Sequence, residues 1–232
     1  MSVVFCQCHK FVTISGARWV FKDAEYVSSD GVGQMREEII LIGPMCAGKS
    51  SVAIAVARSL SLLNYPIDRI KWYYRFKNGY NLVYGTEVLR TKGFEALLSY
   101  SEDFFSVKEL RVMLDDFAGG VFDFGASHSY CPDEGRFGEL QKLLSNFRNV
   151  VLLLPCADVD HSIDVLSERI RRRYTETERS KEIVESYIAM NRKFVCHSSN
   201  SALATHTVYT DGKSVEEVAA IVLRLAGYDS TG

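Results

Sequence analysis

The chain has 232 residues, of which 47% are hydrophobic and 24% charged, so we expect one large domain or a domain with an appendage. Its 27 Lys and Arg residues nearly balance 29 Asp and Glu residues, and a net charge of −2 argues against nucleic acid as a partner. No apolar stretch approaches the ~18 residues of a membrane-spanning helix. The first residues lack the pattern of a signal peptide. We therefore expect a cytoplasmic protein without a membrane partner, either a monomer or a weak homo-oligomer.

The cysteine pattern favours reduced thiols. Six cysteines are spread over the whole chain, unlike the dense spacing of a small disulfide-linked domain. Cys6, Cys8 and His9 could form half of a metal site, but no second pair of ligands completes it.

Residues 1–36 differ from the rest of the chain. Their apolar residues, Phe11 to Phe21, favour one short hairpin, and a Ser-, Gly- and Asp-rich stretch at 28–33 resembles a linker. We expect this N-terminal extension to be a hairpin or a partly disordered arm.

From residue 37 onward, apolar runs alternate with helical patterns. The pattern predicts strands at 39–42, 121–124, 150–154 and 207–210, and a short second strand around Ile67. It predicts helices at 49–63, 86–100, 105–117 and 137–147, another that begins at 158–160, and a last one capped by Ser214 and Glu217. Strands separated by helices predict a parallel sheet covered on both faces, in a three-layer α/β/α domain over 37–232.

The segment Gly43 to Ser50 matches the pattern GxxxxGK[ST] at every position. Glycines let the backbone wrap around a polyphosphate, and the helix that follows directs its positive end toward the phosphates. In this pattern the lysine, Lys49, binds phosphate oxygens and the hydroxyl of Ser50 holds Mg²⁺. The nucleotide-binding residues predicted for ATP are Gly43, Met45, Cys46, Ala47, Gly48, Lys49, Ser50 and Ser51.

Other classes of P-loop protein fit less well. A GTPase needs an NKxD motif, and the nearest match, Asn191 to Phe194, lacks the aspartate. Motor and AAA-type ATPases usually carry an Asp-Glu pair after an apolar strand, whereas Phe124 follows Asp123.

The loop from Ile42 to Ser50 closely resembles that of shikimate kinases, and the order of elements over 38–226 is similar. This resemblance implies a P-loop kinase fold with a five-stranded parallel sheet of order 2-3-1-4-5. It also implies ATP and Mg²⁺ as cofactors, a small hydroxylated substrate as acceptor, and an arginine-rich lid over ATP, here at about 171–181.

The acceptor side departs from the family pattern. The family has Asp-x-Asp after its second strand, and here the first aspartate is replaced by Pro66 while Asp68 remains. The family arginine that binds the shikimate carboxylate follows Gly-Phe, and here Glu95 follows Gly93 and Phe94. We therefore expect a phosphotransferase with an acceptor other than shikimate.

Candidate catalytic residues follow from these positions. Asp68 could orient or deprotonate an acceptor hydroxyl, or could only cap a helix. Asp123 could hold Mg²⁺ at the end of its strand, where Ser127 and His128 also follow, although a histidine there is often only a loop residue.

Arginines 171–173 and 179 could bind the transferring phosphoryl group, and among them we expect Arg172 to be catalytic. The alternative is that this charge run is only a solvated helix face. The sequence leaves two further functions open, a nucleoside or nucleotide kinase and a nucleotide-binding regulatory module with little turnover.

Overall fold

The computed structural model describes residues 11–14, 17–20, 35–175 and 181–228. The chain divides into two units, 1–33 and 34–232, each described here by itself. In the first unit, β1 (Phe11–Ile14) pairs antiparallel with β2 (Ala17–Val20). The candidate metal ligands Cys6, Cys8 and His9 lie outside the described residues.

The second unit is built on one five-stranded sheet in which every neighbouring pair of strands is parallel. Its strands are β3 (Arg36–Ile42), β4 (Asn64–Pro66), β5 (Val121–Asp123), β6 (Phe147–Leu154) and β7 (His206–Tyr209). The spatial order β4-β5-β3-β6-β7 confirms the predicted order 2-3-1-4-5. The continuous apolar runs of β3 and β6 explain why these two strands lie inside the sheet and not at its edges, because central strands of a parallel sheet are buried on both faces.

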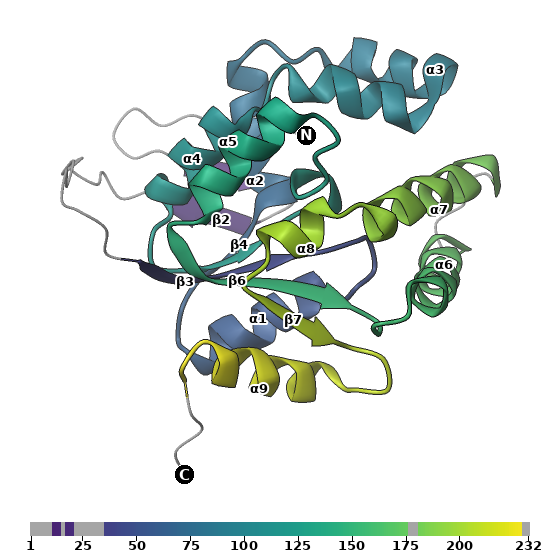
Figure 1. Cartoon of the computed structure of the whole chain (residues 1–232). Coiled ribbons are helices and arrows are strands. Elements are labelled where there is room, and N and C mark those ends of the chain that lie inside the picture. Colours follow the sequence, from purple (N-terminus) through teal and green to yellow (C-terminus); the bar gives the residue numbers. More distant parts are fainter. Residues whose placement is uncertain (1–10, 15–16, 21–34, 176–180, 229–232) are drawn as a thin grey trace. The chain divides into compact units, whose positions relative to one another are not determined.

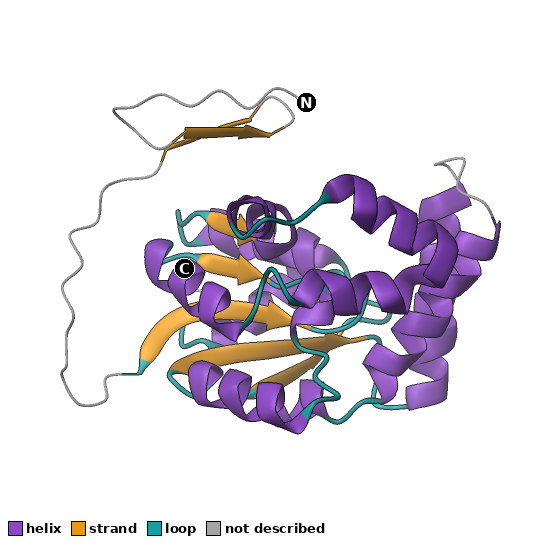
Figure 2. Cartoon of the chain, turned by 90° about the horizontal axis from the view of Figure 1, so that it is seen from above, coloured by secondary structure: helices purple, strands orange, loops and turns teal. Residues whose placement is uncertain are grey.

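Helices cover both faces of this sheet (Figures 1 and 2). Figure 1 shows α1 and α9 on one face and α2, α4, α5 and α8 on the other, while α6 and α7 pack together beyond the end toward which the strands point. The helices are α1 (Lys49–Ser59), α2 (Ile67–Lys77), α3 (Leu82–Glu102), α4 (Val107–Asp116), α5 (Glu134–Leu144), α6 (Val159–Thr175), α7 (Lys181–Cys196), α8 (Ser199–Leu203) and α9 (Val215–Leu225). Every helix among the described residues is too short or too polar to cross a membrane.

Several predicted boundaries were wrong. The first helix ends at Ser59 rather than at 63, and Phe147 begins β6 instead of ending the preceding helix. The second strand ends at Pro66, so that Ile67 begins α2, a helix that the sequence analysis did not predict. The aromatic and charged residues of α2 lack the regular apolar spacing by which the other helices were recognised.

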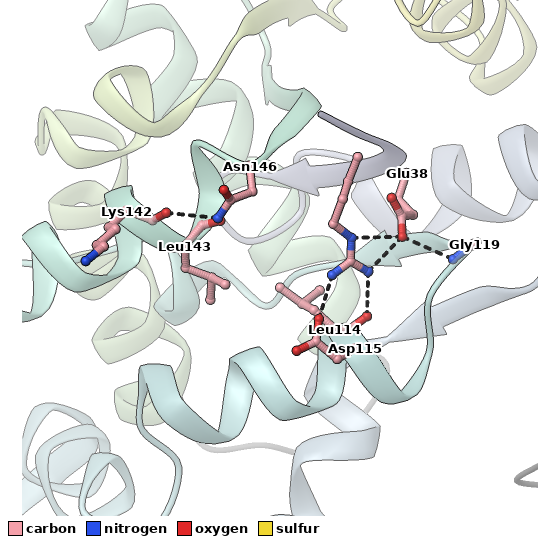
Figure 3. A network of polar contacts seen from close by, with 8 residues as sticks. Glu38, Leu114, Asp115, Gly119, Lys142, Leu143 and Asn146 are labelled. Atoms are coloured by element: carbon pink, nitrogen blue, oxygen red, sulfur yellow. Dashed lines mark hydrogen bonds and ion pairs between the residues drawn. The ribbon is translucent and has the colours of Figure 1, made fainter. Parts of the chain in front are cut away.

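Arg36 holds the amino end of the central strand β3 through three partners that Figure 3 labels, Glu38, Leu114 and Asp115. Its guanidinium donates hydrogen bonds to Glu38 at 2.7 and 3.1 Å, to Asp115 at 2.7 Å and to the Leu114 carbonyl at 2.8 Å. It also lies 4.5 Å from the centre of the Phe147 ring. Hydrogen bonding to Arg36 and to the Gly119 amide outweighs the effect of partial burial and lowers the pKa of Glu38. These contacts join the amino end of β3 to α4, and the phosphate-binding loop follows the opposite end of the same strand.

We expect Arg36→Met to lower the free energy of unfolding by about 1–2 kcal/mol, because it leaves the half-buried Glu38 carboxylate without its cation. Chemical denaturation measures the effect. The matched control is Arg148→Met, which removes a solvent-exposed pair with Glu37 at 3.3 Å and should cost less than about 0.5 kcal/mol. Equal losses in the two variants would contradict the role assigned to Arg36.

Candidate active site

The loop between β3 and α1 has the backbone geometry of a phosphate-binding loop. Gly43, Cys46 and Gly48 have φ values of +133°, +61° and +96°. A Cβ atom on Gly43 would lie 2.5 Å from the Leu153 carbonyl oxygen on the neighbouring strand β6, so only glycine fits there. Gly48 precedes α1, and no described side chain caps this helix, which leaves its first amides directed at the loop.

Lys49 is enclosed by this loop. Its Nζ donates to the carbonyl oxygens of Gly43 at 2.9 Å and Pro44 at 2.8 Å. Burial lowers its pKa, while the nearby carboxylates of Asp123 and Asp68 act in the opposite direction. The lysine therefore lies within electrostatic reach of both candidate carboxylates.

Ser50 and Asp123 form the predicted magnesium pair. Burial raises the pKa of the Asp123 carboxyl, which is 6% exposed, and a hydrogen bond from the Ser50 hydroxyl and the charge of Lys49 oppose this rise. A hydroxyl beside a carboxylate supplies the hard oxygen ligands that Mg²⁺ prefers, and one carboxylate is the usual number because the ion keeps most of its waters. Among the described residues no group of three or more His, Cys, Asp and Glu side chains could hold a metal. The pair fits Mg²⁺.

Asp68 lies in the first turn of α2, and its charge also acts on the pKa of Lys49. Pro66 occupies the N-cap of that helix, so the capping role considered for Asp68 does not apply. In the sheet Pro66 pairs with Asp123, which brings Asp68 to the same edge as the magnesium pair. Its carboxylate packs against Gly125, where any Cβ atom would overlap it.

Lys71 and His128 surround the Asp68 carboxylate. Asp68 forms an ion pair with Lys71, and although desolvation opposes ionisation, the charge of Lys71 and its hydrogen bond hold the pKa of Asp68 well below its usual range. The side chain is 59% exposed, so an ionised carboxylate faces solvent at this edge. An ionised group of such low basicity is suited to orienting a hydroxyl rather than to removing its proton in advance.

His128 holds the loop after β5. The amide of Gly125 donates to its Nδ1 at 3.0 Å, and its Nε2 lies 3.4 Å from the Lys71 Nζ. Burial, together with the charge of Lys71, places the pKa of His128 well below its ordinary value, so the ring is neutral. Because Nδ1 accepts a hydrogen bond, the ring proton resides on Nε2. This arrangement assigns His128 to positioning Gly125 against Asp68.

A contact that the sequence analysis missed fixes the phosphate-binding loop from α7. The amide of Met45 donates to Asn191 Oδ1 at 2.7 Å, and Asn191 Nδ2 donates to the Met45 carbonyl oxygen at 3.2 Å. Asn191 is buried, and Arg169 on α6 adds a contact of 3.4 Å to the Cys46 carbonyl oxygen. Both helices that flank the predicted lid therefore bind the loop.

The predicted lid coincides with the end of α6 and the start of α7. Arginines 171–173 lie in the last turns of α6, with exposed side chains, and residues 176–180, which include Arg179, lie outside the described residues. Arg171 contacts Glu185 on α7 at 3.4 Å. The positive charge of Arg173 contributes to lowering the pKa of Lys49. The roles of Arg172 and of lid closure stay predictions.

Glu95, which stands where the family pattern has an arginine, pairs with Lys193 on α7. The Lys193 Nζ donates to both carboxylate oxygens at 2.8 and 2.9 Å. A kink at Gly93, where φ is +85°, divides α3 just before this residue. The charge of Lys193 is therefore neutralised by Glu95.

The sequence analysis located five side chains of this site, Lys49, Ser50, Asp68, Asp123 and His128, because each follows a strand or the loop motif. It missed Lys71, Arg75 and Asn191. One signal was present for the first two, since Asp68, Lys71 and Arg75 are spaced three and four residues apart and so share a helix face.

Comparison with known proteins shows the fold. No protein-family model and no curated protein matches the sequence. Among solved structures, a shikimate kinase from Acinetobacter baumannii in complex with shikimate is 16% identical with a TM-score of 0.53, and the match covers 84% of this chain and 95% of that chain. A shikimate kinase from Bacteroides thetaiotaomicron is 17% identical, with a TM-score of 0.52 and coverage of 82% and 98%. TT1252 from Thermus thermophilus is 19% identical, with a TM-score of 0.50 and coverage of 86% and 100%. The chain has the fold of shikimate kinases.

We expect Lys71→Met to raise the pKa of Asp68, because it removes the cation that does most to stabilise the ionised form. The titration of the Asp68 carboxyl carbon by NMR measures this change directly. Lys77→Met, on the exposed end of the same helix, is the control and should leave that titration unchanged. If Asp68 titrates identically in wild type and Lys71→Met, the ion pair does not set its ionisation.

We expect Asn191→Ala to weaken the binding of a non-hydrolysable ATP analogue about tenfold, because Met45 loses two hydrogen bonds that hold the loop. Calorimetric titration measures the affinity, and thermal unfolding measured separately shows whether the fold persists. Ser186→Ala, which removes a hydrogen bond internal to α7, serves as control. Unchanged affinity in Asn191→Ala would show that the loop binds the nucleotide equally well without the two hydrogen bonds to Asn191.

Proposed function

We propose that the protein is an ATP- and Mg²⁺-dependent phosphotransferase that acts on a hydroxyl group of a small molecule. One observation carries this proposal: Lys49 of the phosphate-binding loop lies within electrostatic reach of two carboxylates, Asp123 and Asp68, which the pairing of Pro66 with Asp123 brings to the same end of the sheet. Phosphoryl transfer requires a phosphate site, a magnesium site and a positioned acceptor, and it requires little covalent chemistry from the protein.

Each residue has a role that follows from its place. The loop amides and Lys49 bind the phosphates, and Ser50 and Asp123 hold the ion, which would neutralise charge on the phosphate oxygens. Asp68 accepts a hydrogen bond from the acceptor hydroxyl and orients its oxygen toward the phosphorus. Because Asp68 is ionised, it also receives the proton as the hydroxyl loses it during transfer. Arginines at the end of α6, of which Arg173 already acts on Lys49, add positive charge on the transferring group.

The acceptor in this proposal is not shikimate. A ligand carboxylate placed near Glu95 would face a carboxylate, and the nearest cation, Lys193, is already paired by Glu95. Glu95 and Lys193 are exposed, and where a bound acceptor displaces the solvent around them an unpaired carboxylate costs several kcal/mol. We therefore expect shikimate to be used about a thousandfold less efficiently in kcat/KM than the preferred acceptor.

Two other functions predict different results when ATP consumption is measured with a panel of acceptors. A nucleoside or nucleotide kinase would transfer phosphate to nucleosides or nucleotides. A regulatory module, which the loss of the first family aspartate at Pro66 would favour, would bind ATP without acceptor-dependent turnover.

The test measures ATP consumption with Mg²⁺ against a panel of sugars, polyols, hydroxy acids including shikimate, nucleosides and nucleotides. We expect a small hydroxylated compound other than shikimate to raise consumption above the basal rate. Lys49→Ala should abolish that increase and weaken ATP binding while circular dichroism stays unchanged, because both hydrogen bonds of the Lys49 Nζ among the described residues end on carbonyl oxygens of the loop. Arg58→Ala, on the exposed face of α1, is the control.

An ATP affinity and a turnover that are both unchanged in Lys49→Ala would overturn the nucleotide site. Tight ATP binding with no stimulation by any acceptor would instead favour the regulatory module. Efficient phosphorylation of shikimate would refute the role given to Glu95.

A further inference from the structure

The buried Arg75 lies on the same face of α2 as Asp68 and has no hydrogen-bond or ion-pair partner among the described residues. Asp68, Lys71 and Arg75 follow one another at intervals of three and four residues, so their side chains share one face of the helix. Lys71 and Arg75 are buried, with exposed fractions of 7% and 8%. Burial lowers the pKa of both cations. Two cations therefore lie removed from water beside the carboxylate that orients the acceptor.

The surroundings of Arg75 are aromatic. Its Cζ lies 5.1 Å from the centre of the Trp72 ring and 5.7 Å from that of Tyr80. Its Nε is buried without a hydrogen-bond partner, and the described part of the chain gives the guanidinium neither a hydrogen bond nor an ion pair. Stacking on rings orients a guanidinium while leaving its N–H groups free for another ligand.

The nearby carboxylates are already neutralised. The two carboxylates whose charges raise the pKa of Arg75 are those of Asp68 and Glu102. Asp68 pairs with Lys71, Glu102 pairs with Arg136, and the His128 ring, on which charges of both pairs act, is neutral. Among these groups three cations face two carboxylates, and the surplus positive charge is that of Arg75. A buried charge without a partner is unfavourable, and an anionic ligand would relieve it.

We propose that Arg75 binds an anionic group, a carboxylate or a phosphate, carried by the acceptor whose hydroxyl Asp68 orients. This inference rests on the proposed function and adds the class of substrate. The guanidinium of Arg75 contacts the ring of Trp72, which lies one helical turn nearer to Asp68, and the charge of Asp68 acts on the pKa of Arg75. A small molecule could then contact Asp68 with its hydroxyl and Arg75 with its anion. The planar guanidinium binds either anion through two parallel hydrogen bonds.

Trp72 provides a local signal for the test. The chain has two tryptophans, Trp19 and Trp72, so Trp19→Phe leaves Trp72 as the single reporter beside Arg75. The Trp19→Phe protein is first saturated with a non-hydrolysable ATP analogue and Mg²⁺, which occupies the phosphate-binding loop. Inorganic phosphate and acetate are then titrated separately, with sodium chloride at equal ionic strength as the reference. Tryptophan emission and calorimetry are recorded together.

We expect at least one of the two anions to cause a saturable change in Trp72 emission, and the stronger response identifies the group that the acceptor carries. Adding Arg75→Met should weaken that binding at least tenfold, and Arg75→Lys should retain part of it. Arg90→Met, which alters an exposed arginine paired with Glu87, is the matched control and should bind as before. Circular dichroism confirms that each variant is folded.

Absence of a saturable response to both anions in the protein with Arg75 intact would overturn the inference, whether or not the Arg75 variants fold. Equal binding by Trp19→Phe and its folded Arg75→Met derivative would also overturn it. Failure of the ATP analogue to bind in the first step is a separate result, which would contradict the proposed function.

Discussion

The site depends on one close contact between backbones. Where β3 ends, the chain must turn sharply enough to start α1 without striking β6, and at Gly43 a single Cβ atom would meet the Leu153 carbonyl oxygen. This turn directs the amides of the loop inward and folds Lys49 back onto the carbonyl oxygens of Gly43 and Pro44. The roles proposed for Ser50, Asp123 and Asp68 depend on their distance from the ammonium group of that lysine. The central place of β3 in the sheet, with β5 on one side and β6 on the other, supports the turn from both directions.

The acceptor side of the site depends on electrostatic balance rather than on backbone geometry. Lys71 keeps Asp68 ionised, His128 stays neutral and holds Gly125, and Gly125 leaves space for the Asp68 carboxylate. These groups are coupled, so a change in one alters the others. By contrast, Glu95 and Lys193 pair in an exposed position, where solvent weakens the interaction. In the proposed function, the charges that would contact an acceptor therefore lie on α2 rather than at the position where the family pattern has its arginine.

Sequence reasoning found what local patterns encode. The buried strands follow from continuous apolar runs, the loop from its motif, and the last helix from Ser214 and Glu217, whose capping box is present. Helix α2 could not be found in this way, because its aromatic residues pack on one another and obscure the apolar spacing. Asn191 could not be recognised either, since nothing near it in the sequence indicates that it binds Met45. The neutrality of His128 depends on burial and on charges from other elements, which a sequence alone does not bring together.

The clamp between Asn191 and Met45 also bears on the order in which the protein assembles. The two residues are 146 positions apart, so the loop acquires the partners that hold it only after most of the chain has been made. Contacts of such long sequence separation form late, because the entropy of closing the intervening chain must be overcome first. A nascent chain still lacking α7 can form β3 and α1 without the buried amide that holds Met45 between them. Under the proposed function, nucleotide binding would thus become tighter as the domain is completed, and ATP would stabilise most strongly the molecules in which α7 has already docked.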